Sequence, residues 1–139
     1  MALTLDRIPV DLVERFWFHV KHLIAMGCEA VTTEMTPEWI LAEALADRRM
    51  IWVAFDSDAP FPFLAAASVG QRQTNDGLVV FIDAIGGHDR ERWLPACLAE
   101  LEGHAKAAGA TRIEVEGRRG WERVLPGYRV VRVVMEKVL

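Results

Sequence analysis

The sequence predicts a single domain of the α/β class, more narrowly α+β, over residues 1–139. A length of 139 residues suits one domain, and a chain of that size buries roughly two-thirds of its unfolded surface. Apolar residues at helical spacing alternate along the chain with short apolar runs typical of strands, and no repeat or linker separates them. With 52% apolar and 26% charged residues, the composition is that of a globular protein.

The first third of the sequence predicts one strand and two helices. Residues 1–9 contain apolar and polar positions in alternation, which is typical of a strand. Asp11 is expected to cap a helix whose apolar stripe ends at Gly27, because glycine commonly terminates helices. Thr36 followed by Pro37 predicts the cap and the first residue of a second helix.

The middle of the sequence predicts three strands. Met50–Phe55 and Phe63–Val69 are apolar runs separated by turn residues, and together they predict an antiparallel hairpin. Leu78–Ile85 is rich in β-branched and apolar residues and is the best candidate for a central strand. The pair Gly86-Gly87 is expected to break that strand.

The last third of the sequence predicts a long helix followed by short elements. Asp89 is expected to cap the helix, and Gly109 is expected to end it. Ile113–Val115 predicts a strand, and Arg119–Leu125 predicts a short helix. Tyr128–Val138 predicts a long alternating strand, or a bent pair of strands, that closes the fold.

The cysteines and the apolar runs indicate a compartment. Cys28 and Cys97 lie far apart and lack a second thiol or histidine at metal-ligand spacing, so we expect two buried thiols in a reducing environment. His19 and His22 share one helical face, but no third ligand is nearby, so we expect no metal site. No apolar run approaches the ~20 residues of a membrane span, and the expected location is cytoplasmic.

The charge is unevenly distributed along the chain. Sixteen basic and twenty acidic residues give a net charge of −4. Residues 117–139 carry six basic and two acidic side chains, a net charge of +4, which leaves −8 on the residues before them. An acidic body argues against general nucleic-acid binding. The basic segment predicts either a site for an anionic partner at Arg118, Arg119 and Arg123, or a solvated face paired with the acidic body.

The order of the expected elements resembles the fold of the GCN5-related N-acetyltransferases. In the C-terminal stretch, Gly127-Tyr128 stands where that family has the Gly-Phe pair that closes its last helix. The resemblance implies a mixed, mostly antiparallel central sheet flanked by helices. The segment from Gly117 to Trp121, continued by Gly127 to Arg129, also resembles small acetyltransferase-like proteins of phages and prophages. That second resemblance implies a host cytoplasm or a virion as the location.

The resemblance implies an acyl-CoA site in the loop between the central strand and the long helix. In the family, backbone N–H groups of this loop cradle the pyrophosphate of acetyl-CoA, helped by the positive end of the helix. The residues that this implies for the cofactor here are Ile85, Gly86, Gly87 and His88, assisted by Arg90 and Arg92. The two glycines are equally typical of a tight strand-to-helix turn. Asp89 and Glu91 depart from the family pattern, because small residues are usual near their positions.

The position of the family's usual catalytic tyrosine falls on Arg123, which cannot donate a proton as a phenol does. The only tyrosine, Tyr128, is expected to be a core residue with a polar tip. The remaining candidates for the base that deprotonates an acceptor amine are Asp83 on the central strand and His88 in the loop. The alternatives are a strand aspartate satisfied by its surroundings and an exposed loop histidine.

Two functions follow from these residues. The first is an acyl-CoA-dependent N-acyltransferase that uses a small-molecule or protein amine as acceptor. The second is a non-catalytic protein of the same fold with a virion, assembly or partner-binding role, in which a second copy of the chain or a virion component is the partner. The order of elements and Gly86-Gly87 favour the first function, and the altered loop and Arg123 favour the second.

Overall fold

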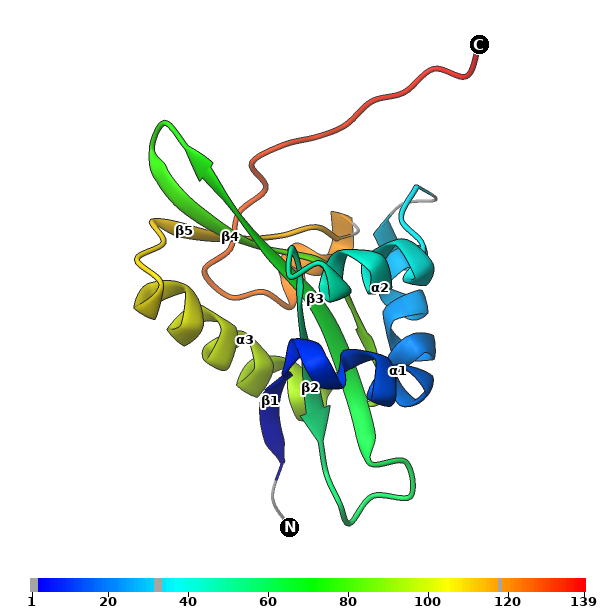
Figure 1. Ribbon diagram of the computed structural model, residues 1–139. Helices are drawn as coiled ribbons and strands as arrows, with labels where there is room; N and C mark the ends of the chain where they lie inside the picture. Colours follow the sequence, from blue (N-terminus) through cyan, green and yellow to red (C-terminus); the bar gives the residue numbers. More distant parts are fainter. Residues whose placement is uncertain (1–2, 32–33, 118) are drawn as a thin grey trace.

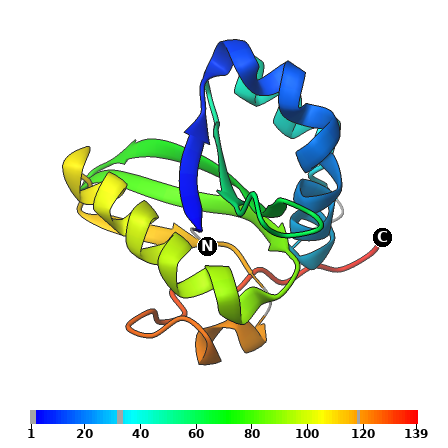
Figure 2. The same ribbon diagram turned by 90° about the horizontal axis from the view of Figure 1, so that it is seen from below.

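A computed structural model describes residues 3–31, 34–117 and 119–139. A five-stranded sheet forms its centre, with strands in the order β1-β2-β3-β4-β5 (Figure 1). Helices cover both faces, and α1 and α3 lie on opposite sides of the sheet (Figure 2). The elements are β1 (Thr4–Ile8), α1 (Val10–Val31), α2 (Pro37–Leu45), β2 (Met50–Phe55), β3 (Phe63–Thr74), β4 (Gly77–Gly87), α3 (Arg90–Ala107), β5 (Arg112–Val115) and the 3₁₀ helix η1 (Arg119–Arg123).

The sheet is antiparallel from β1 to β4, and β5 pairs parallel to β4. A parallel neighbour needs a crossover, and α3 supplies it between β4 and β5. The α+β class with a mixed, mostly antiparallel sheet is therefore confirmed. The hairpin expected at Met50–Phe55 and Phe63–Val69 is also confirmed, with β3 continuing to Thr74.

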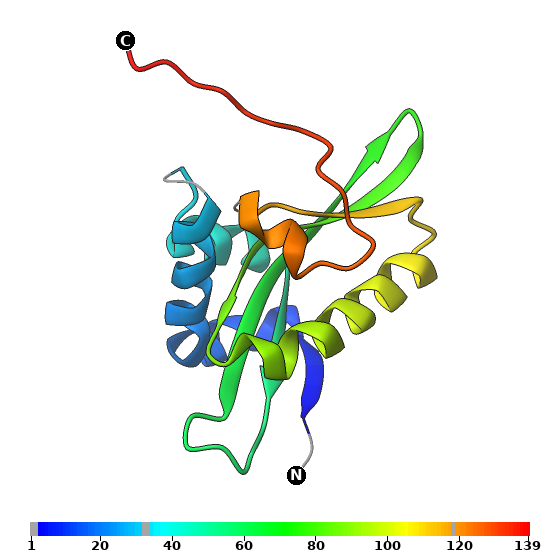
Figure 3. The same ribbon diagram turned by 180° about the vertical axis from the view of Figure 1, so that it is seen from behind.

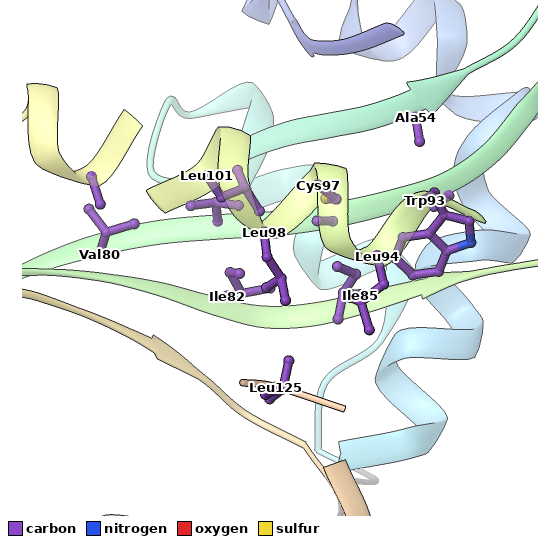
Figure 4. Packing of buried hydrophobic residues seen from close by; sticks show 14 of the residues in the cluster. Ala54, Val80, Ile82, Ile85, Trp93, Leu94, Cys97, Leu98, Leu101 and Leu125 are labelled. Carbon is purple, nitrogen blue, oxygen red and sulfur yellow. The ribbon is translucent and has the colours of Figure 1, made fainter. Parts of the chain in front are cut away.

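Each face of the sheet has its own hydrophobic core. On one face, α3 packs against β4, and Figure 4 shows Trp93, Leu98 and Leu101 of the helix beside Ile82 and Ile85 of the strand. On the other face, α1 and α2 pack over β2 and the middle of the sheet through fully buried apolar side chains. The buried residues of this second core include Val20, Leu23, Ile24, Ile40, Ile51 and Ala84.

The capping residues in the sequence predict the start of α2 correctly but not the start of α1. Thr36 caps α2 as expected, since its hydroxyl accepts the N–H of Trp39 at 3.1 Å and Pro37 is the first helical residue. The cap expected at Asp11 is wrong, because α1 begins at Val10 and Asp11 lies in its first turn. A carboxylate there still interacts favourably with the helix dipole.

The expected helix end at Gly27 is also wrong, because α1 continues to Val31. Gly27 is buried and faces β4, and a Cβ at this position would lie 2.6 Å from the Ile85 nitrogen. The glycine therefore permits a close approach between helix and strand rather than ending the helix.

The expected strand break at Gly86-Gly87 is wrong for the same kind of reason. Both glycines belong to β4 and remain paired with β3. A Cβ on Gly86 would lie 2.8 Å from the Gly27 nitrogen, and a Cβ on Gly87 would lie 2.7 Å from the Ala65 Cβ. Packing against α1 and β3 is thus a sufficient reason for both glycines.

The closing strand expected at Tyr128–Val138 is wrong. Residues 128–139 form no regular secondary structure, and the C-terminal part projects away from the body as an extended arm (Figures 1 and 3). A strand needs a hydrogen-bonded neighbour, and the described part of the chain pairs none with this segment. The helix expected at Arg119–Leu125 is present as the shorter η1.

Candidate functional site

The sheet opens between β4 and β5 at Asp83. The pairing of β4 with β5 ends at Ile82 and Val115, whereas its pairing with β3 continues to Gly87. The β3–β4 register shifts at the same point, so Asp83 has no directly opposed residue on β3. Such a β-bulge bends the strand and increases its twist. It therefore explains why β4 departs from β5 here and leaves residues 83–87 without a partner on that side.

The backbone of β4 presents polar groups to this opening. The N–H of His88 donates to the Leu64 carbonyl at 2.9 Å, which fixes the alternation of the antiparallel ladder. By that alternation Gly86 bonds toward β3, whereas the N–H and C=O groups of Ile85 and Gly87 point toward the opening. The opening is thus bordered by a strand edge able to pair with an extended amide-containing ligand.

This strand edge leads directly to the N-terminus of α3. Asp89 adopts a left-handed conformation (φ 62°, ψ 58°) and makes no side-chain cap, contrary to the expected capping role. A left-handed residue followed by helical residues turns consecutive N–H groups toward one side, as in anion-binding nests. Among the described residues, the N–H groups of Asp89, Arg90 and Glu91 have no backbone partner. Trp93 holds the loop in place, since its Nε1–H donates to the His88 carbonyl at 2.8 Å.

The two arginines in the first turn of α3 differ in their surroundings. Arg92 is half-buried and forms an ion pair and hydrogen bond with the buried carboxylate of Asp56. Arg90 is exposed in the first turn of α3. Of the two, Arg90 is better placed to meet an anion that arrives from solvent, because the charge of Arg92 is neutralised by Asp56.

Asp83, expected as a base, forms an ion pair with Arg49. The Arg49 Nε–H donates to Asp83 Oδ2 at 2.9 Å, and both side chains are largely buried. The guanidinium also lies over the rings of Phe81 and Trp39, at 4.9 and 5.3 Å from the ring centroids. Asp83 Oδ1 is buried without a hydrogen-bond partner among the described residues. The carboxylate is therefore held on one side and has a free acceptor atom on the other.

Glu116, which sequence reasoning missed, lies beside Asp83 at the opening. Its N–H donates to the Ile82 carbonyl at 2.9 Å, the last bond between β4 and the chain that follows β5. Burial, and then the charge of Asp83, raises the pKa of the Glu116 carboxyl. A carboxylate with a raised pKa is a stronger base and is typical of functional sites. Its sequence clue is its position, just after the strand that runs parallel to β4.

Glu114 forms a cluster of ion pairs on β5. Its carboxylate contacts Arg132 at 2.9 Å, Arg72 at 2.7 Å and Arg112 at 3.2 Å. The hydrogen bond from Arg132, followed by those from the other two arginines, lowers the pKa of Glu114 to about 2. Arg132 of the basic segment is therefore paired with the chain's own acidic body. Arg123 is exposed on η1, the side chain of Arg119 is not described, and Arg118 lies outside the described residues.

His88 lies just after the C-terminal end of β4, away from the Asp83–Glu116 pair. Four strand residues separate it from Asp83, so the two lie five residue steps or roughly 16 Å apart along the strand, and the two expected bases do not form one site. The His88 ring stacks on His22, with centroids 5.9 Å apart, beside a hollow of about 560 Å³ that faces α1. Phe18, His19 and Phe61 to Phe63 line the rest of it. In the described part of the chain, no three potential ligands meet to hold a metal ion.

Tyr128 is not directed to the opening. It is half-buried against the α3 core, and its hydroxyl donates to a Glu102 carboxylate oxygen at 2.9 Å. Burial and this hydrogen bond raise the pKa of the phenol. The side chain is thus a packing residue with a polar tip.

Comparison with known proteins identifies the fold. The sequence matches no protein-family model, and no curated protein is similar to it at a significant level. A GCN5-related N-acetyltransferase from Ralstonia eutropha JMP134 has a similar structure, with a TM-score of 0.70, 13% identity and 99% of each chain covered. Glucosamine-6-phosphate N-acetyltransferase from Arabidopsis thaliana has a TM-score of 0.66, 16% identity and 99% of each chain covered. Ribosomal-protein-alanine N-acetyltransferase from Brucella melitensis biovar Abortus 2308 has a TM-score of 0.67 and 11% identity, with 99% of this chain and 98% of that chain covered. The chain therefore has the fold of the GCN5-related N-acetyltransferases.

No helix in the described part of the chain is both long and apolar enough to cross a membrane. The buried state expected for both cysteines is confirmed. Burial raises the pKa of Cys28 to about 11 and that of Cys97 to about 12, so neither thiol is a nucleophile near neutral pH.

Proposed function

We propose that the chain binds an acyl-CoA in the opening between β4 and β5 and transfers the acyl group to an amine. One observation carries the proposal: β4 loses β5 as a partner at the bulge of Asp83 yet stays paired with β3 to Gly87, beside the N-terminus of α3. The fold shared with N-acetyltransferases supports the same chemistry.

The residues of the opening suit the chemistry of coenzyme A in two ways. The pantetheine arm contains amide groups, and the outward N–H and C=O groups of Ile85 and Gly87 are able to bond with them as a strand does. The pyrophosphate is an anion, and the free N–H groups of residues 89–91 with the helix dipole favour it. Arg90 adds a positive charge at the same place, which offsets part of the negative charge of the Asp89 and Glu91 carboxylates.

Glu116 is the base that this arrangement favours. A bound acyl thioester supplies an activated carbonyl carbon, at which the neutral amine forms the new C–N bond as the C–S bond breaks. The Glu116 carboxylate accepts the proton that the amine loses, and the departing thiolate takes up one proton to become free thiol. Asp83 acts as a positioning residue in this scheme, because Arg49 holds its carboxylate by an ion pair and its charge, after burial, raises the pKa of Glu116.

Calorimetric titration with acetyl-CoA tests the binding step. We expect saturable binding by the unmodified chain and a dissociation constant raised about tenfold in Arg90→Glu. Lys106→Glu is the matched control, because it makes the same charge change sixteen residues away on the same helix, roughly 24 Å along its axis. Absence of binding at millimolar acetyl-CoA, or equal weakening in both variants, contradicts the proposed site.

Release of coenzyme A thiol tests the transfer step. The first acceptors to examine are glucosamine 6-phosphate and a peptide with an N-terminal alanine, since similar structures act on such amines. For a productive acceptor, Glu116→Gln is expected to lower kcat by roughly 10²–10⁴-fold while acetyl-CoA binding is kept. The acid limb of the pH–rate profile is expected to disappear in the same variant. An unchanged kcat shows that Glu116 is not the base.

The second candidate is a non-catalytic, partner-binding protein of the same fold, including the virion or assembly role implied by the resemblance to phage proteins. This candidate is favoured by Tyr128, the only tyrosine in the sequence. Its hydroxyl donates to Glu102 and does not point into the opening, so no phenol is placed there to donate a proton. The titration and the thiol assay together distinguish the two candidates. Binding without turnover of any amine, or no binding at all, favours the partner-binding role.

A further inference from the structure

A hollow of about 560 Å³ lies at the end of β4 and takes no part in the proposed acyl transfer. α1, the loop between β2 and β3, the start of β3 and the residue after β4 form its walls, whereas the opening lies between β4 and β5. A volume of this size is typical of small-molecule sites. Six of its seven lining side chains carry rings, so we call it the aromatic hollow; they are Phe18, His19, His22, Phe61, Phe63 and His88.

Most rings of the aromatic hollow already contact one another in favourable geometries. His19 stacks on Phe63, with centroids 5.4 Å apart and planes 14° from parallel, and His22 stacks on His88 at 5.9 Å and 29°. Phe18 meets the His19 ring edge-on at 5.6 Å. Offset and edge-to-face ring pairs are favourable beyond the area that they bury. The walls therefore suit a further planar ring.

Two phenylalanines of the aromatic hollow are largely uncovered. Phe18 on α1 is 86% exposed, and Phe61 in the loop between β2 and β3 is 79% exposed. Exposed aromatic side chains that gather at one concave place mark a binding site. A ligand that enters between the helix and the loop removes both rings from water.

The walls of the aromatic hollow are held in place by the fold. His88 donates its N–H to the Leu64 carbonyl at 2.9 Å, and its own carbonyl accepts the Nε1–H of Trp93 at 2.8 Å. The Phe63 ring packs edge-on against Phe55, with centroids 5.1 Å apart. The histidines of the opposite wall belong to the 22-residue helix α1. A site on such elements is largely pre-formed, which lowers the cost of ordering it around a ligand.

The polar groups of the aromatic hollow favour an anion. Among the described residues that line it, the polar side chains are three imidazoles, and none is a carboxylate. An imidazole donates at least one N–H in either protonation state, and a carboxylate only accepts. Glu14 and Arg15, one helical turn before the lining residues of α1, carry opposite charges that offset each other. Charge complementarity therefore favours a ligand carboxylate over a ligand ammonium group.

We propose that the aromatic hollow binds a small planar aromatic acid. The ring system of the ligand lies between the exposed rings of Phe18 and Phe61, and its carboxylate accepts hydrogen bonds from the imidazoles. This second site is separate from the acyl-CoA opening, and the proposal does not depend on the proposed acyl transfer.

Calorimetric titration of the full chain with 2-naphthoate tests the proposal. At pH 6, where histidine side chains commonly carry a proton, we expect saturable binding with a dissociation constant below about 1 mM. The cation 2-naphthylmethylammonium has the same rings and is expected to bind at least about tenfold more weakly. Decalin-2-carboxylate keeps the charge without planar rings and is expected to bind at least about threefold more weakly. Absence of 2-naphthoate binding at millimolar concentration, or equal binding of either comparison compound, overturns the proposal.

Two pairs of variants test the residues that carry the proposal. Phe18→Ala/Phe61→Ala is expected to raise the dissociation constant of 2-naphthoate at least about tenfold. Its matched control is Val134→Ala/Met135→Ala, because these side chains are 91% and 89% exposed elsewhere, and it is expected to leave the affinity unchanged. All four side chains are exposed, so neither variant is expected to lower Tm by more than a few degrees.

A second pair tests the charge of the aromatic hollow. His19→Asp is expected to weaken 2-naphthoate binding at least about tenfold, because a carboxylate then faces the ligand carboxylate. Gln73→Asp is the control, since it adds a negative charge to β3 ten residues from Phe63, roughly 33 Å along the strand. Equal weakening in both variants shows a general effect of net charge and contradicts the proposed site.

Amide chemical shifts and competition locate the ligand. We expect 2-naphthoate to shift the amides of residues 18–22, 61–64 and 88, and shifts confined to other residues overturn the proposal. Saturating acetyl-CoA is expected to leave the 2-naphthoate dissociation constant unchanged within about twofold, since the opening lies on the other side of β4. Displacement of 2-naphthoate by acetyl-CoA shows that the two share one site and contradicts a separate one. If acetyl-CoA does not bind at all, the proposed acyl transfer fails, whereas 2-naphthoate binding still decides the present proposal.

Discussion

Replacement of Gly27 by alanine tests the close contact between α1 and β4. A Cβ at Gly27 would lie 2.6 Å from the nitrogen and 2.9 Å from the carbonyl carbon of Ile85. Both are backbone atoms of β4, which is held by β3, so neither moves aside by a side-chain rotation. The helix and the strand must therefore separate by about 1 Å to restore an ordinary contact, which loosens the buried core between them.

The magnitude follows from two opposing effects. Alanine stabilises a helix interior by about 1 kcal/mol relative to glycine. Overpacking of a buried contact costs about 1–3 kcal/mol and more where backbone must shift, so the expected net loss is about 2 kcal/mol. For a chain of this length that lowers Tm by roughly 6–8 °C. Gly103→Ala is the control, since Gly103 lies inside α3 with nothing within 4 Å of the added Cβ.

Thermal unfolding followed by circular dichroism measures both variants. Gly103→Ala is expected to raise Tm by roughly 3 °C, because only the helix preference acts there. Both variants replace a helical glycine by alanine, so the helix preference acts in the same direction in each. Opposite signs of the two Tm shifts therefore show the effect of the contact between α1 and β4. If Gly27→Ala is as stable as Gly103→Ala, the close contact between α1 and β4 does not exist in solution.

Three further outcomes are expected. Arg132 and two other arginines hold the pKa of Glu114 at about 2, below its ordinary value of about 4.3. This carboxylate therefore stabilises the fold at neutral pH, and the stabilisation is lost as pH falls from about 5 to 2. The urea midpoint of unfolding, measured between pH 7 and 2.5, should fall less steeply in Glu114→Gln than in the unmodified chain. Thr36→Ala is expected to lower the unfolding free energy by about 1 kcal/mol through loss of the α2 cap, measured by urea titration, and Thr36→Ser should restore it. Cys28 and Cys97 are expected to react with a thiol reagent only in denaturant, and rapid reaction of either thiol in the native protein contradicts its burial.

Elements whose causes are local could be predicted from the sequence. Thr36 and Pro37 mark the start of α2 because the cap bond and the fixed φ of proline act within one helical turn. Met50–Phe55 is a strand because its run of apolar residues suits a position covered on both faces. The class of the fold follows from the order of such elements.

The role of each glycine could not be predicted from its neighbours in the sequence. Gly27 and Gly86 were expected to end a helix and a strand, and instead each lets α1 and β4 approach the other. The partner that makes a side chain unacceptable at Gly27 is about sixty residues away, at Ile85. Nothing in the local sequence distinguishes a glycine of this kind from one that terminates an element.

In the candidate site too, residue types could be predicted from the sequence, whereas their contacts could not. Asp83 was identified as a chemistry-bearing residue, but its bulge depends on the register with β3, and its ion pair depends on Arg49. The pKa of Glu116 is raised by burial and then by the charge of Asp83, and both effects arise where the chain leaves β5 beside β4. Arg92 was expected to assist a phosphate, and its pairing with Asp56 joins the first turn of α3 to the loop after β2, which lie far apart in the sequence.

The sequence by itself determined the α+β class, the helix cap at Thr36 and the hairpin of β2 and β3, because these depend on apolar spacing and on residues within one turn of each other. Only the tertiary structure decided where β4 separates from β5 and which carboxylates meet there. The physical reason is that ion pairs, pKa shifts and strand edges arise between groups far apart in the chain. Their energies depend on distances of a few ångströms, which only the packed fold sets.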